Sequence, residues 1–138
     1  MNWKRIWTGT LLAGAVFCAL DYVINSVLLK STWEPLLLAG TIKAIQPYNN
    51  LPFIDFGIGF VLIWLYASAR PRLGPGPKTA LLMGTLAWFL LYAPLASAQW
   101  FWFRLPGNIP ITYLIAGLLQ CWVCIYLAGW QYIEKSPE

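Results

Sequence analysis

Histidine is absent from the 138-residue sequence. Imidazole is the commonest metal ligand in proteins, and its unperturbed titration lies closest to neutral pH. Its absence excludes haem and zinc held by histidine, and it excludes nucleophiles activated as Ser–His or Cys–His pairs. We therefore predict no cofactor, no metal site and no catalytic residue of these kinds.

Charged residues are also scarce. Lysine, arginine, aspartate and glutamate make up 10% of the chain, whereas about 25% is usual for a soluble domain. Hydrophobic residues reach 59%, and the mean hydropathy is +0.62. The net charge of +4 rests on too few basic residues to indicate a nucleic-acid partner. This composition is typical of a protein that lies in a lipid bilayer.

Long apolar runs are what the sequence does contain. They cover approximately residues 6–29, 51–69, 78–100 and 109–132. A helix needs roughly 20 residues to cross about 30 Å of hydrocarbon. The sequence therefore predicts an all-α polytopic membrane protein, with residues 1–138 forming one bundle of four transmembrane helices. The first run is too long for a signal peptide and lacks an A-x-A cleavage site, so we expect it to be retained.

The basic residues divide unequally between the predicted loops. Lys4, Arg5, Arg70, Arg72, Lys78 and Lys135 flank one side of the bundle, against Lys30, Lys43 and Arg104 on the other. Because lysine and arginine concentrate on the cytoplasmic side, we predict that both termini and the 70–78 loop are cytoplasmic. On the outer side, residues 33–45 fit an interfacial helix, and residues 100–108 fit an aromatic belt.

Polar side chains interrupt the predicted spans, although ionisable groups are costly inside a bilayer. Residue counting places Asp21, Asn25, Asp55, Gln99 and Gln120 between the midplane and the outer interface. Asp21 and Asn25 are one helical turn apart, so they share a face. We predict a polar pocket that opens outward, with Arg104 as the basic residue placed to reach the carboxylates.

A functional and a structural interpretation of this pocket stay open. In the functional one, the pocket is a cation or proton site, or the polar end of a small-molecule pocket. In the structural alternative, Asp21 and Asn25 bridge neighbouring helices, and Asp55 caps the start of its helix. Gly57 and Gly59, which follow Asp55, permit a close approach of another helix under either interpretation.

Cys121 and Cys124 form a C-x-x-C pair in the last span, which is one pattern of redox-active thiols. Four-helix thiol oxidoreductases of the membrane relay electrons through a second pair of loop cysteines, which this chain lacks. Reactive thiols also need an exposed, electropositive setting, whereas this pair falls near the middle of a span. We predict that the pair has a structural role.

The loop GPGPKT, Gly74–Thr79, partly matches a phosphate-binding loop. Pro77 stands where that motif needs its second glycine, and proline has no N–H to offer a phosphate. Nucleotide binding is therefore not expected. Arg70, Arg72 and Lys78 suit either contact with an anionic lipid or a stiff corner that sets the topology.

Two stretches, DYVINSVLLKSTW in the first span and RPRLGPGPKTA after the second, carry a family resemblance. The chain resembles a group of small uncharacterised four-helix bacterial inner-membrane proteins. Their first helix carries an acidic residue followed by Asn four positions later, as Asp21 and Asn25 do here. The resemblance implies a bacterial inner-membrane location and supplies no catalytic residue.

The functional interpretations fall into three classes. The leading one is a non-enzymatic accessory or scaffold subunit, or a homo-oligomer, that associates with other membrane helices. The second is a small oligomeric transporter or channel that uses Asp21 and Asp55 in an outward-facing pocket. The third is a membrane enzyme acting on a lipid, a quinone or a thiol, which the missing histidine disfavours.

Overall fold

The computed structural model describes residues 2–42, 51–103 and 105–132, and these ranges contain no strand. The elements in chain order are α1 (Trp3–Val23), the π-helix η1 (Ile24–Leu28), α2 (Lys30–Leu38), α3 (Leu51–Leu73), α4 (Pro77–Phe101) and α5 (Asn108–Trp130). Four helices in these ranges are long and apolar enough to cross a membrane, the first being α1 with η1. The predicted all-α class and the four long apolar helices are confirmed, with boundaries shifted by a few residues.

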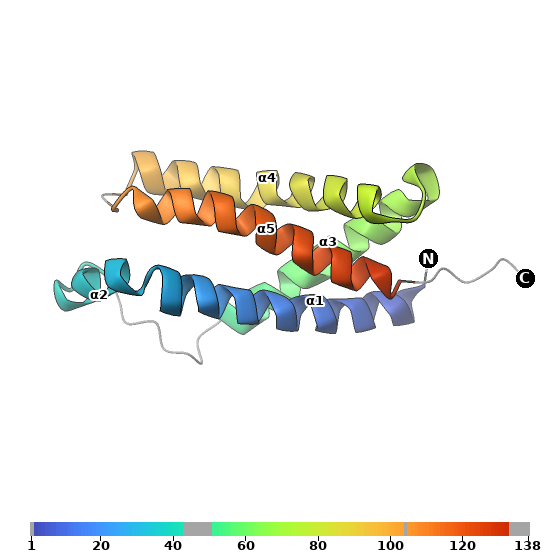
Figure 1. The fold of residues 1–138 in the computed structure, drawn as a ribbon, viewed down its shortest axis with the longest axis horizontal. Coiled ribbons are helices and arrows are strands. Elements are labelled where there is room, and N and C mark those ends of the chain that lie inside the picture. The colour runs from blue at the N-terminus through green and yellow to red at the C-terminus, as the bar shows by residue number, and fades with distance from the viewer. Residues whose placement is uncertain (1, 43–50, 104, 133–138) are drawn as a thin grey trace, which may run out of the picture.

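The helices are arranged so that the chain connections gather at two ends of the bundle (Figure 1). The start of α1, the α3–α4 corner and the end of α5 lie at one end, while α2 and the α4–α5 connection lie at the other. α3 runs antiparallel to α1 and crosses behind α5. The basic residues of the start of α1 and of the α3–α4 corner therefore share one end of the molecule.

Glycine sets the distance between α1 and α3. A Cβ atom built on Gly59 would lie 2.7 Å from the backbone nitrogen of Gly14 and 3.2 Å from the carbonyl oxygen of Thr10. The ring of Phe56 in turn packs directly on Gly14, where no side chain could fit. Of the two α3 glycines predicted to permit a close approach, Gly59 makes it and Gly57 does not, because Gly57 faces open space.

α4 and α5 pack together through tryptophan as well as through glycine. The indole nitrogen of Trp88 donates a hydrogen bond of 2.8 Å to the Leu114 carbonyl, and Trp122 donates one of 2.9 Å to the Thr85 hydroxyl. Gly84 lies against this contact, since a Cβ there would be 3.1 Å from the Trp122 ring. α4 continues through Pro94 without ending.

The short helix α2 differs from the interfacial helix predicted at residues 33–45. It begins at Lys30 and ends at Leu38, and residues 43–45 lie outside the described ranges. The change of direction comes from η1, where the Leu29 N–H bonds to the Ile24 carbonyl five residues earlier. α2 is then held against the start of α5 by a 2.6 Å hydrogen bond from Asn108 Nδ2 to the Thr32 hydroxyl.

The α1–α3 contact can be tested with one methyl group at either of two neighbouring positions. Gly59→Ala places a Cβ against the α1 backbone and should lower the free energy of unfolding by about 1–3 kcal/mol, as overpacking typically does. Gly57→Ala adds the same methyl on the same helix into open space. Thermal unfolding of the detergent-solubilised protein should separate the two variants, and equal melting temperatures would contradict the packing described here.

Candidate functional site

The α1–α3 contact brings near each other the carboxylates of two long apolar helices, Asp21 and Asp55. Cys18 lies one turn after Gly14 on α1, and Asp55 lies one turn before Gly59 on the antiparallel α3. The close approach of the two glycines therefore places these residues opposite each other. The Cys18 thiol lies beside the Asp55 carboxylate, and Asp21 interacts electrostatically with Asp55. Asp55 is buried, with 5% of its surface exposed.

Gln120 of α5 joins this pair to the other helices. Its amide Nε2 donates to the Phe17 carbonyl of α1 at 3.1 Å, and its Oε1 accepts from the Tyr92 hydroxyl of α4 at 2.9 Å. The same side chain lies beside Asp21. Only 2% of Gln120 is exposed, so each of these groups would be unpaired without its protein partner.

Asn25, in η1, extends the polar contacts toward the α2 end of the bundle. Its Nδ2 donates to the Asp21 carbonyl at 3.0 Å, and its Oδ1 accepts from the Tyr113 hydroxyl of α5 at 2.5 Å. Tyr113 also interacts electrostatically with Asp21. The π-helical turn follows Asp21 closely, and single π turns recur at functional sites in helices.

We refer to these side chains as the polar cluster. Its members are Cys18, Asp21, Asn25, Asp55, Tyr92, Tyr113 and Gln120. All four long helices contribute to it. Within the described ranges, the two carboxylates interact with each other and with neutral side chains, and neither forms an ion pair with lysine or arginine. The predicted charge partner Arg104 lies outside these ranges.

Among the described residues, no hydrogen bond joins the other predicted site residues to the polar cluster, although Cys124 interacts electrostatically with Cys18 and Asp55. Gln99 is on α4, and its buried Oε1 has no hydrogen-bond partner among the described residues. Cys121 and Cys124 are unpaired thiols that are fully buried in the main hydrophobic core. A thiol substrate could not reach them without opening the bundle. In the described ranges, no three His, Cys, Asp or Glu side chains are placed to hold a metal ion.

The predicted pocket left out three members of the polar cluster: Cys18 and the two tyrosines, Tyr92 and Tyr113. Tyr113 shares a helix face with Gln120 by its spacing, and Tyr92 lies one turn after Trp88 on the α4 face that packs against α5. A buried tyrosine hydroxyl normally has a hydrogen-bond partner. That rule, applied to the aromatic residues of each polar face, would have pointed to both.

The α3–α4 corner is a structural unit at the opposite end of the bundle. Arg70 donates a 3.0 Å hydrogen bond to the Tyr132 carbonyl, and its guanidinium lies 5.4 Å from the centre of the Tyr132 ring. The Gly76 N–H is bound by the Tyr66 hydroxyl, and the Thr79 hydroxyl donates to the Gly74 carbonyl. The Gly76 N–H and the Thr79 hydroxyl, which a phosphate-binding loop would offer, are therefore used within the corner. Arg72 and Lys78 are exposed.

Comparison with models of known protein families, with curated proteins and with solved structures gives no match for this chain.

The link between α4 and the polar cluster is a single hydroxyl group. Tyr92→Phe leaves the buried Oε1 of Gln120 without its donor, so it should lower the free energy of unfolding by about 1 kcal/mol. Tyr22→Phe is the matched control, because Tyr22 is 69% exposed. Thermal unfolding in detergent should show a lower melting temperature only for Tyr92→Phe. An equal effect of both changes would argue against the hydrogen bond as the source of stability.

Proposed function

We propose that the chain is a multi-pass protein of the bacterial inner membrane that binds a proton at Asp21 and Asp55. The membrane location is supported by the four long apolar helices and by the large hydrophobic side chains on their outer faces. Both termini and the α3–α4 corner are on the cytoplasmic side in this proposal. The basic residues at that end of the bundle support this orientation.

The single observation that carries the proton proposal is that a carboxylate of α1 and one of α3 are near enough to interact electrostatically inside the apolar bundle. An isolated negative charge is costly in an apolar medium, and two neighbouring ones add mutual repulsion. No lysine or arginine in the described ranges offsets them. A proton bound at one of the carboxylates, with the neutral groups of Gln120 and Cys18 nearby, lowers that cost.

The polar cluster also supports a side of the bundle from which a proton would reach the carboxylates. Asp55 and Gln120 are buried, whereas Asp21, Asn25 and Tyr113 retain partial exposure. Asn25 follows Asp21 toward the α2 end, which is the outer end in the proposed orientation, and Tyr113 is bonded to Asn25. A proton would therefore enter from outside by way of Tyr113 and Asn25. Four spans are few for a complete transport path, so this function calls for at least two copies of the chain.

A second candidate function is that of an accessory or scaffold subunit. It is favoured by the aromatic run at the end of α4, Trp100, Phe101, Trp102 and Phe103, which are all exposed. Such side chains suit both the membrane interface and contact with the helices of another protein. In this version the polar cluster serves mainly to hold the four helices together.

The proposed orientation predicts the behaviour of reporter fusions at the C-terminus. A fused green fluorescent protein should fluoresce in cells, because it folds in the cytoplasm, and a fused alkaline phosphatase should be inactive there. The measurement is whole-cell fluorescence and phosphatase activity at matched expression. An active phosphatase with a dark fluorescent fusion would reverse the orientation of the bundle.

The proton site predicts the result of removing each charge without changing side-chain shape. Asp21→Asn and Asp55→Asn should each lower proton flux into protein-containing vesicles at least tenfold, because an amide cannot take up and release the proton. Glu34→Gln, on the exposed helix α2, removes an acidic group outside the polar cluster and should leave flux unchanged.

The same experiment distinguishes the two candidate functions. Flux that is absent from the unmodified protein, or unaffected by both aspartate changes, would count against a proton site. Recovery of another membrane protein in a fixed ratio after purification in mild detergent would then favour the accessory role.

A further inference from the structure

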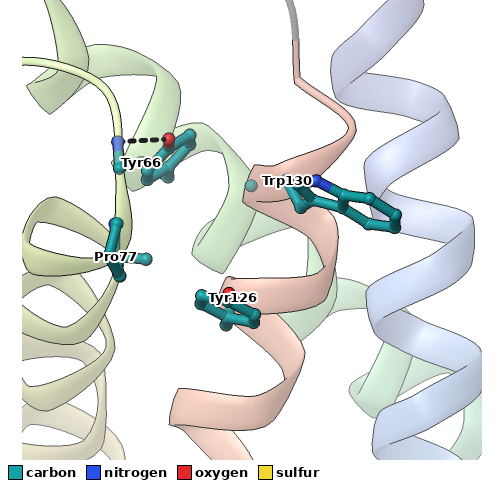
Figure 2. A pocket seen from close by; sticks show the side chains of 7 residues that line it. Tyr66, Pro77, Tyr126 and Trp130 are labelled. Atoms are coloured by element: carbon teal, nitrogen blue, oxygen red, sulfur yellow. Dashed lines mark hydrogen bonds between the residues drawn. The ribbon is translucent and has the colours of Figure 1, made fainter.

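A groove at the α3–α4 corner lies apart from the polar cluster. It is lined by Tyr66 of α3, by Gly76, Pro77 and Ala80 at the start of α4, and by Tyr126 and Trp130 of α5 (Figure 2). Its cavity of about 90 Å³ has room for about three water-sized or methylene-sized groups, at roughly 30 Å³ each. The size and the aromatic walls suit a segment of hydrocarbon chain rather than a folded partner.

One wall of the groove carries an unused hydrogen-bond donor. The Tyr66 hydroxyl accepts a 3.2 Å hydrogen bond from the Gly76 N–H, and its own proton has no acceptor among the described residues. Tyr66 is only 4% exposed, so bulk water does not readily serve it. A buried donor of this kind favours a ligand with an oxygen acceptor at this point.

Two exposed cations belong to the chain segments that form this groove. Lys78 directly follows Pro77, which lines the groove, and Arg72 lies in the last turn of α3. Arg70 is different, because its guanidinium is bound to the carbonyl and ring of Tyr132. Of the three basic residues of the corner, Arg72 and Lys78 are therefore the ones free to meet an anion.

We propose that this groove binds one anionic phospholipid from the surrounding bilayer. Its phosphate lies near Lys78 and Arg72 and accepts from the Tyr66 hydroxyl, and its acyl chain follows Tyr126 and Trp130 between α4 and α5. Trp130 is 83% exposed at the end of its helix, where tryptophan commonly meets the headgroup region. This inference rests on the proposed membrane location and does not depend on the proton site.

The test measures lipid binding to the full-length protein in mild detergent by native mass spectrometry. Phosphatidylglycerol and phosphatidylcholine with identical acyl chains are compared, so that only the headgroup charge differs. We expect phosphatidylglycerol to bind at least about tenfold more tightly. Arg72→Gln with Lys78→Gln should remove most of this preference, because each basic residue near a membrane surface contributes several-fold in affinity.

Matched control variants distinguish lipid binding in the groove from general effects of charge and hydrophobicity on lipid binding. Lys4→Gln with Arg5→Gln removes the same charge at the same end of the bundle and should keep the preference. Trp130→Ala should weaken phosphatidylglycerol binding several-fold, whereas Trp102→Ala should not. Both tryptophans are 83% exposed, but Trp102 lies at the other end of α4. Neither tryptophan change removes buried packing, so folding should be retained.

Several results would overturn the inference. Equal binding of both lipids, equal losses from the two double variants, or equal losses from the two tryptophan changes would each do so. Displacement of phosphatidylglycerol by millimolar inorganic phosphate would indicate a phosphate site without a lipid preference. Washing membranes with alkaline carbonate tests the proposed membrane location independently of lipid binding in the groove. Release of the protein would overturn the membrane proposal, whereas retention without lipid preference would overturn only the groove.

Discussion

The backbone contact between Gly14 and Gly59 is the constraint on which the rest of the bundle depends. With no side chain between them, α1 and α3 lie close enough for Cys18 and Asp55 to meet one turn away. Asp21 then faces both Asp55 and Gln120. A larger residue at either glycine would separate the helices and leave these polar groups without partners. The polar cluster is therefore a consequence of how two helices pack, as much as of which polar residues they carry.

The two ends of the bundle carry different kinds of polar groups. The polar cluster uses acidic and neutral groups inside the helices, whereas the α3–α4 corner gathers basic and aromatic groups around Tyr66 and Tyr132. Arg70 closes the corner, and Arg72 and Lys78 remain at its surface. In the proposed membrane these two regions face opposite sides. A proton site near one surface and a lipid contact at the other can then operate without sharing a residue.

The sequence predicted the features that depend on local periodicity and missed those that depend on contacts between helices. Length and hydropathy predicted the four helices, and a spacing of one turn placed Asp21 and Asn25 on one face. The partners of Gln120 could not be read in this way, because helices that are apolar on every side give no periodic sign of which face turns inward. For the same reason the opposite neighbourhoods of Gly57 and Gly59 became apparent only from the packed structure.

Gln120 has a consequence for the order in which the chain is assembled. Its hydrogen-bond partners belong to α1 and α4, and both precede α5 in synthesis. If the helices enter a bilayer in chain order, α5 arrives with a polar amide that only the earlier helices can satisfy. Stable insertion of α5 would then require that α1 and α4 are already in position to bond Gln120, so that this residue would make α5 the last helix to insert.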